Sequence, residues 1–396
     1  MRTAIAIICF AMLAACAVHQ LKADHASLFQ AETDRVREEF GFPGMTAAYV
    51  LEDGTVGTAA SGLADVEANV PMTDNTRMLS ASIGKSFVGA LCIDLAMEGQ
   101  LSLDEPVSHW IGTFNWFQRL PNHDFITLRH LLTHSAGIPD HVHMDTFAEA
   151  FSKAWQESDN PFPPGRLVDF ILDKPALFPA GYGWAYSDTG YILAGLIIEA
   201  VTGRPCFEQI QEQFLTPLRL LDTFSADHRD LDRLAPGYMR PDNLFELPVK
   251  TLDTGGCLHW HPAVEWTGGG LVSTSRDLAH WGAALFAGEA MTGDYLSELL
   301  NAVAVDSDLA DITYGAGVAV YSSGPFGPVY GHAGWIPGYV SSLRHYPEYG
   351  VTIAFQINTD IGIIDSDDDV LKTIENRLIQ VFTGKQRSCT SMKKPI

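Results

Sequence analysis

The stretch SASIGKSFVGALCIDLAMEG, residues 80–99, places a serine and a lysine at the head of a segment that is otherwise mostly apolar or small. If a helix begins near Ser82, the side chains of Ser82 and Lys85 share one face, because residues three apart in a helix are neighbours. The residues that follow are apolar on nearly every side, which is typical of a buried helix. The stretch therefore predicts a buried helix in the core of the fold, with a hydroxyl and an amine together at its start.

This pair of side chains has a chemical use and a structural alternative. A serine at a helix N-terminus lies beside free backbone N–H groups that can stabilise an oxyanion. A lysine amine accepts a proton near neutrality where burial and neighbouring donors disfavour its charged form. Alternatively, Ser82 is a simple N-cap and Lys85 extends its amine toward solvent. The spacing also occurs in SMKK, residues 391–394, where no helix would organise it.

Length and charge limit the classes of function. The 396 residues are 46% hydrophobic and carry a net charge of -23, so the chain can bury a large core. This acidic balance repels phosphate backbones, and nucleic acid is therefore not an expected partner. We expect one domain over residues 25–385 and a polar tail over residues 386–396.

The first residues have the pattern of an export signal. Arg2 precedes an apolar run too short to span a bilayer, and residues 13–16 read LAAC, the pattern that precedes a lipid-modified cysteine. We expect a signal over residues 1–16, a lipid anchor on Cys16, and a periplasmic or cell-envelope location. The alternative is ordinary signal-peptidase cleavage at Ala15-Cys16-Ala17, which gives a soluble exported protein.

The hydrophobic pattern changes along the chain. Strand-like alternation is found near both ends, and helical spacing dominates the middle. The expected elements are a helix over residues 25–42, a hairpin about residues 52–54, a mostly helical region over residues 82–286, strands within 315–324, 328–335 and 339–358, and a last helix over 365–382. This order predicts an α+β fold: one antiparallel sheet built from both chain ends, flanked by the terminal helices, with the helical region inserted.

Two further stretches contain chemically useful side chains. Tyr186-Ser187-Asp188 lies on a predicted loop immediately before an apolar helical run. His332-Ala333-Gly334 lies at the end of a predicted strand, where the glycine lets a substrate approach the backbone. Each has a structural alternative, as a core tyrosine and as a hydrogen-bonded surface histidine.

Together with Ser82, these stretches resemble the motifs of the serine β-lactamase and penicillin-recognising family, nearest to class C β-lactamases, DD-peptidases and related esterases. The resemblance runs from about residue 26 to residue 382. It includes the passages LRHLLTHSAGIPD (128–140), PLRLLDTF (217–224) and GGGLVSTSRDLAHW (268–281). It implies the β-lactamase/transpeptidase-like fold.

The resemblance also implies roles for single residues. Ser82 would be the acylated nucleophile, activated by Lys85, with Tyr186 in the place of the YxN tyrosine that shuttles the proton. Which of Lys85 and Tyr186 is the formal base stays open, since coupled groups titrate as a unit. The backbone N–H groups of Ser82 and Trp335 would form the oxyanion hole, and water would hydrolyse the acyl-enzyme.

Two departures from the family pattern concern the substrate. Asp188 stands where the family has asparagine, and an ionised carboxylate only accepts hydrogen bonds. It would favour a substrate with a donor or a cationic amine, or else be structural. His332-Ala333-Gly334 replaces KTG, so a largely neutral ring stands where lysine would bind a substrate carboxylate. Both changes, with the apolar bulk of Trp335, favour an esterase or amidase over an efficient β-lactamase.

Two competing interpretations fail on context. His130 and His134 are four residues apart, but HExxH is absent and no acidic ligand has a suitable offset, so no metal is expected. The sequence THSAG around Ser135 nearly matches a nucleophile elbow, which requires a preceding strand, whereas residues 127–132 have a helical pattern. Cys92, Cys206, Cys257 and Cys389 are expected to be free, buried thiols.

We therefore expect a serine hydrolase that cleaves an ester or amide of a small molecule or peptide without metal or organic cofactor. Trp184 and residues 141–143 are expected at the rim of its pocket. The alternatives are a D-amino-acid-specific (DD-)peptidase, a weak β-lactamase, or a penicillin-binding or scaffolding protein that does not hydrolyse its ligand.

Overall fold

A computed structural model of the chain describes residues 24–157, 162–306 and 311–383. The expected signal with Cys16 and the polar tail over residues 386–396 lie outside the described residues. The description therefore covers nearly all of the expected domain.

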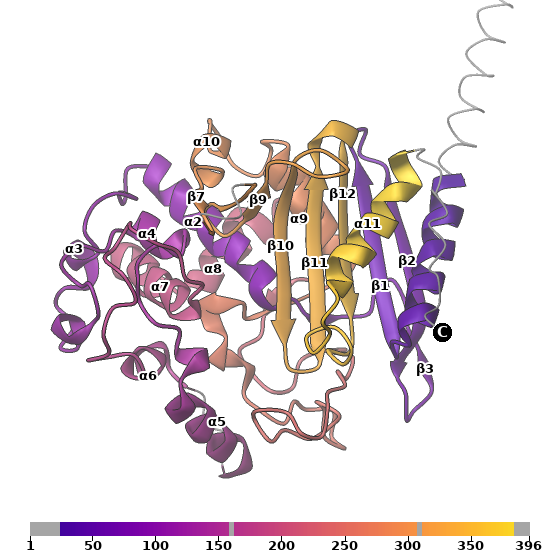
Figure 1. Cartoon of the computed structure of the whole chain (residues 1–396), viewed down its shortest axis with the longest axis horizontal. Helices are drawn as coiled ribbons and strands as arrows, with labels where there is room; N and C mark the ends of the chain where they lie inside the picture. Colours follow the sequence, from indigo (N-terminus) through magenta and orange to yellow (C-terminus); the bar gives the residue numbers. More distant parts are fainter. Residues whose placement is uncertain (1–23, 158–161, 307–310, 384–396) are drawn as a thin grey trace, which may run out of the picture.

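The main element is an antiparallel sheet built from the two ends of the chain (Figure 1). Its nine strands have the order β3-β2-β1-β12-β11-β10-β9-β8-β7. The N-terminal strand β1 pairs with the last strand β12, with Ala48 opposite Ala354. The strand bounds are β1 Gly44–Leu51, β2 Val56–Asp65, β3 Val70–Pro71, β7 Val303–Ala304, β8 Ile312–Tyr314, β9 Ala319–Tyr321, β10 Val329–Ile336, β11 Tyr339–Tyr346 and β12 Val351–Ile357.

The sheet separates two hydrophobic cores because its central strands are buried on both faces. On one face, the helix over residues 24–40 and α11 (Val370–Thr383) pack their apolar sides through Phe29, Val36 and Ile374. On the other face, α9 (Ser275–Phe286) packs against β1, β11 and β12 and continues into the core of the helical region. Figure 1 shows α11 lying across the sheet and α9 behind it.

The inserted region is mostly helical and contains a second, small sheet. Helix α2 runs through its core, with Phe87 stacked on Trp281 of α9 at a centroid distance of 4.0 Å. The small sheet has the order β4-β6-β5. The bounds are α2 Gly84–Met97, α3 Ser108–Ile111, α4 Leu128–Leu132, α5 Asp145–Glu157, α6 Pro164–Asp169, α7 Asp188–Thr202, α8 Cys206–Ile210 and α10 Leu296–Leu299, with β4 Met78–Leu79, β5 Phe224–Ser225 and β6 Leu271–Ser273.

Most of the sequence-based expectations are confirmed, and two need correction. The terminal helices, the hairpin of β1 and β2, and the single sheet from both chain ends are as predicted. The stretch 339–358 was expected to be one strand but forms two, because Pro347 begins a tight turn and Gly350 has a φ of 58° there. The short strands of the small sheet were not predicted, since two or three residues give no detectable alternation.

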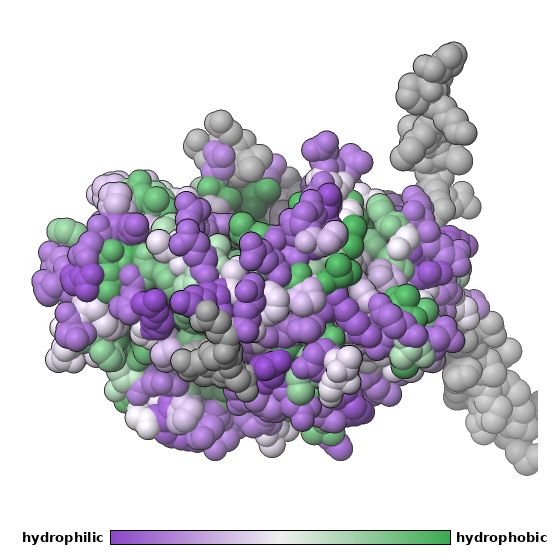
Figure 2. Space-filling view, turned by 90° about the horizontal axis from the view of Figure 1, so that it is seen from below, coloured by the Kyte–Doolittle hydropathy of each residue, from purple (hydrophilic) through white to green (hydrophobic). Residues whose placement is uncertain are grey.

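Hydrophilic residues cover much of the molecular surface. The face in Figure 2 is largely hydrophilic, and its hydrophobic residues form small separate patches. This distribution agrees with the excess of acidic over basic residues. Among the described residues, no helix combines the length and the apolar character needed to cross a bilayer.

Candidate active site

Ser82 lies in a strained turn between the small sheet and the central helix. A 3-10 turn, η1 (Ala81–Ile83), joins β4 to α2, so Ser82 lies just before the α-helix instead of at its first residue. Ala81 has a φ of 49°, a left-handed conformation that is rare for a residue with a side chain. Ser80 fixes the turn by donating its N–H to the Leu271 carbonyl at 2.9 Å. Strain held by its surroundings is common at functional sites.

Lys85 is completely buried and points at Ser82. Its Nζ lies 3.0 Å from the Oγ of Ser82 and also donates to a carboxylate oxygen of Asp188 and to the carbonyl of Gly268. Three acceptors match the three N–H donors of a lysine ammonium. The observed arrangement therefore excludes the alternative in which Lys85 extends into solvent.

Tyr186 brings a phenol to the same pair. Its ring centroid lies 4.9 Å from the Lys85 Nζ, and its hydroxyl interacts electrostatically with Ser82. Burial, and then the negative charge of Asp188, raise the pKa of Tyr186 well above its ordinary value. The phenol is therefore protonated at neutral pH and can donate a proton. The three predicted catalytic side chains meet at one point.

The loop that carries Tyr186 is held by a buried histidine. His134 has a φ of 58°, and its Nδ1 accepts the backbone N–H of Ser187 at 3.2 Å. Its ring lies 4.2 Å from the ring of Tyr186. Burial lowers the pKa of His134 far below its ordinary value, so the ring is neutral. From the sequence, His134 was considered as a metal ligand and a structural role was preferred, but its contact with the Tyr186 loop was not predicted. No cluster of His, Cys, Asp or Glu side chains suited to a metal ion occurs in the part of the chain that the structure describes.

Asp188, the first residue of α7, forms the ion pair with Lys85 and has two further acids as neighbours. Asp140 accepts the backbone N–H groups of Val142 and Asp188, and burial together with the Asp188 charge raises its pKa to about 7. Burial and the same charge raise the pKa of Glu265 to about 8. Neither acid was predicted as a site residue. Asp140 belongs to a family-like passage, but nothing in the spacing pointed to Glu265.

Strand β10, which carries His332-Ala333-Gly334, lies directly beside the turn η1 that carries Ser82. A Cβ on Gly334 would overlap the Ser80 carbonyl oxygen, so this glycine permits the close approach. The triplet was expected at the end of a strand. It lies instead within β10. His332 is buried, with Nε2 2.7 Å from the Tyr314 hydroxyl and Nδ1 against the Ala333 carbonyl. Burial lowers the pKa of His332 to about 3, so the ring is neutral.

Trp335 differs from His332 in being exposed. Its side chain is 38% accessible, and its indole N–H donates to the Asp360 carboxylate at 3.1 Å. Asp360 also accepts the backbone N–H of Gly338 at 3.1 Å, which fixes the turn after β10. Trp335 is thereby held at the edge of the site.

A small cavity of about 60 Å³ adjoins the Lys85–Asp188 pair. Its lining comes from five separate parts of the chain and combines carboxylates with aromatic rings. It consists of His141, Val142, Phe147, Phe151, Asp188, Phe245, Trp260, Val264, Glu265, Trp335, Ile336 and Pro337. His141 and Val142 are thus at the pocket, as the sequence predicted for this loop. Trp184 lies instead beside Tyr186, with ring centroids 6.4 Å apart.

Comparison with known proteins agrees with this geometry. The Beta-lactamase family model matches residues 29–371. Penicillin-binding protein 4* of Bacillus subtilis is 25% identical over 345 residues, which cover 85% of this chain and 72% of the relative. Esterase EstB of Burkholderia gladioli is 28% identical over 205 residues, half of each chain. D-amino acid amidase from Ochrobactrum anthropi SV3 superposes with a TM-score of 0.75 at 25% identity, covering 90% of this chain and 99% of that chain.

The family match extends over most of the chain, and the relatives include enzymes that are named for ester or amide substrates. The fold and the order of the motifs lead to the same assignment. The chain belongs to the beta-lactamase family of serine hydrolases, and the relatives compared above include an esterase and an amidase.

Proposed function

We propose that the protein hydrolyses an ester or amide through an acyl-enzyme on Ser82. The observation that carries the proposal is the 3.0 Å approach of the Lys85 Nζ to the Ser82 Oγ in a strained turn, with the Tyr186 ring centroid 4.9 Å from the same Nζ. A nucleophile in contact with two proton-transfer groups is the arrangement that covalent catalysis requires.

The reaction would follow two balanced steps. Once the coupled Lys85 and Tyr186 pair has lost one proton to solvent, the Ser82 oxygen attacks the substrate carbonyl and gives its own proton to that pair. The backbone N–H groups of Ser82 and Trp335 would stabilise the oxyanion. The bond to the leaving group then breaks as Tyr186 returns the proton to it. Water attacks the acyl carbon in the second step, gives its proton to the same pair, and releases the acid and Ser82.

The surroundings of His332 favour an ester or amide without a carboxylate at this position. Both ring nitrogens have protein partners and the ring is neutral, so His332 supplies no positive charge for a substrate carboxylate. Lysine in a KTG triplet would supply one. This supports an esterase or amidase ahead of a DD-peptidase or β-lactamase. It also fits the D-amino acid amidase, with which the chain shares its fold over 90% of its length.

Substrate turnover distinguishes these activities. We expect the wild-type protein to hydrolyse p-nitrophenyl butyrate or phenylalanine amide faster than nitrocefin or a D-Ala-D-Ala peptide, and Ser82→Ala to lose this activity. Ser108→Ala, which alters an exposed serine, is the matched control. Labelling by a fluorescent penicillin without any turnover would favour the non-hydrolytic penicillin-binding alternative. Full activity of Ser82→Ala would refute the proposed nucleophile.

We further propose that the protein is exported and attached to a membrane through a lipid on Cys16. The LAAC pattern after a short apolar run supports this location. In cells that express the full chain, the wild-type protein should sediment with membranes and partition into detergent, and Cys16→Ser should release it. An unchanged distribution of Cys16→Ser, or a soluble wild-type protein, would contradict the lipid anchor.

A further inference from the structure

The cavity lined by Asp188, the ion-pair partner of Lys85, combines two chemical characters. Phe147, Phe151, Phe245 and Trp260 provide apolar walls, whereas Asp188 and Glu265 provide carboxylates. The lining histidine, His141, is neutral because burial lowers its pKa to about 4. An apolar pocket with a few polar groups in fixed positions is the usual form of a small-molecule site. The polar groups here are acids, so they select the charge of the ligand.

Glu265 is the acid that the protein itself leaves without a partner. It lies between two 3-10 turns, η5 (Pro262–Val264) and η6 (Trp266–Gly268), and its backbone carbonyl accepts the Gly268 N–H at 2.7 Å. Within the described ranges, its half-buried carboxylate has no hydrogen-bond or ion-pair partner. A partly buried carboxylate without a protein partner is open to a ligand that donates hydrogen bonds.

The local charges point to a cation as that partner. The charge of Asp188 acts on both Asp140 and Glu265, and Lys85 is the cation, among the described residues, whose charge opposes it at both acids. The pair with Asp188 and the contacts with Ser82 and Gly268 use all three of its N–H groups. Lys85 therefore has no N–H group left for Glu265.

We propose that Glu265, together with Asp188, binds a primary ammonium on the acyl part of the substrate, and that the aromatic walls receive the apolar side chain next to it. The ligand class is an ester or amide of an amino acid with a free amine and an apolar side chain. This inference rests on the proposed function, because the ammonium is placed relative to a carbonyl at Ser82. A bound cation also shares the charge of Asp188, which weakens its hold on the Lys85 ammonium.

The test compares substrates that differ only in the amine. D- and L-phenylalanine p-nitroanilide carry the ammonium, and 3-phenylpropionyl p-nitroanilide lacks it. We expect the wild-type enzyme to hydrolyse one of the two phenylalanine p-nitroanilides with a higher kcat/KM than the substrate without an amine. Glu265→Gln should lower the ratio of these two kcat/KM values by about 10- to 100-fold. Glu265→Asp should lower the ratio less. Glu149→Gln, the same change at an exposed position of α5, should leave the ratio unchanged.

Binding measurements keep the test independent of turnover. On Ser82→Ala, calorimetry should show tighter binding of phenylalanine amide than of 3-phenylpropionamide, and the difference should vanish in Ser82→Ala with Glu265→Gln. The ammonium site would be overturned if the two amides bound equally or if neither bound. It would also be overturned if Glu265→Gln lowered kcat/KM equally for the substrates with and without the amine. If Ser82→Ala is fully active but the amine preference persists, the proposed nucleophile fails and the ammonium site stands.

Discussion

Gly269 packs directly against the turn at Ala81: a Cβ on Gly269 would lie 2.6 Å from the Ala81 carbonyl carbon and 3.0 Å from the Ser82 nitrogen. These contacts join the glycine run before β6 to the backbone that carries the proposed nucleophile. Because the contact is between backbones, no side-chain rotation can relieve it.

Gly269→Ala should therefore displace Ser82 and lower kcat for p-nitrophenyl butyrate by about 100-fold, since a shift of about 1 Å at a reacting group has that effect. Gly165→Ala is the control, because a Cβ there meets nothing within 4 Å. Steady-state kinetics on both variants provide the comparison. Wild-type kcat in Gly269→Ala would show that the turn tolerates the added methyl group.

The Lys85–Asp188 ion pair allows a test that separates activity from stability. Lys85→Met removes the buried cation and leaves the partly buried Asp188 beside two other acids, so the free energy of unfolding should fall by about 3 kcal/mol. Adding Asp188→Asn should recover much of that stability while hydrolysis stays lost. Urea unfolding and an ester assay measure the two quantities. Residual activity near wild type in Lys85→Met would exclude a catalytic lysine.

The raised pKa of Glu265 makes stability depend on pH. Burial and the Asp188 charge raise this pKa to about 8, above its value in the unfolded chain. The folded protein then holds more protons than the unfolded one between about pH 4 and pH 8, so the free energy of unfolding falls as pH rises through this window. Glu265→Gln should flatten that slope by up to about 1.4 kcal/mol per pH unit. Urea midpoints between pH 5 and pH 8 measure it, and identical slopes would contradict the shift.

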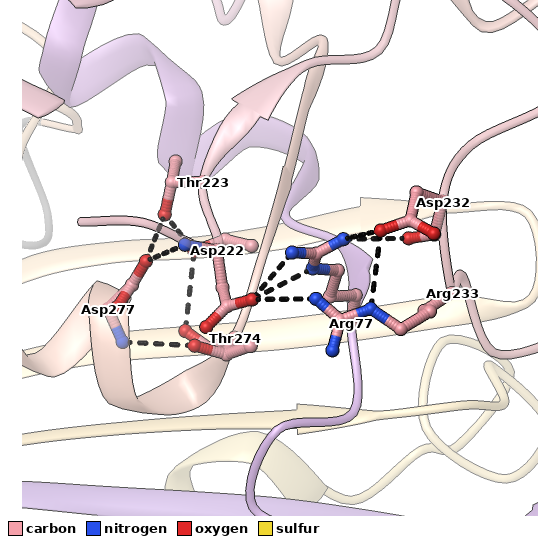
Figure 3. A network of polar contacts seen from close by, with 8 residues as sticks. Arg77, Asp222, Thr223, Asp232, Arg233, Thr274 and Asp277 are labelled. Carbon is pink, nitrogen blue, oxygen red and sulfur yellow. Dashed lines mark hydrogen bonds and ion pairs between the residues drawn. The ribbon is translucent and has the colours of Figure 1, made fainter.

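Arg77 anchors the strand that leads to Ser82, and Figure 3 shows its network. Its guanidinium is nearly buried and pairs with Asp222 and Asp232, each at 2.6 Å. Arg77→Met should lower the free energy of unfolding by about 2 kcal/mol, because it removes several charged hydrogen bonds at a buried site. Arg119→Met, which breaks an exposed pair with Asp173, should have little effect on urea unfolding. Equal effects of the two changes would refute the structural role of Arg77.

The sequence was informative where local pattern and tertiary packing agree. The apolar face of the N-terminal helix and the alternation in β1 and β2 predicted those elements, because each buries the face that its period displays. The two strands within 339–358 were merged because Pro347 and Gly350 were given too little weight. Strands of two or three residues, such as β4 and β6, exist because β-pairing partners from distant segments are present.

Three motifs in order were enough to nominate Ser82, Lys85 and Tyr186, because a reaction of this kind requires these side-chain types and a known family combines them. Only the tertiary structure decided that these three side chains meet. It also placed the three acceptors around Lys85 and gave both ring nitrogens of His332 a hydrogen-bond partner. Glu265 and Asp140 illustrate the difference most clearly. Their pKa values depend on burial and on one another's charge across distant segments, and no local pattern in the chain records that proximity.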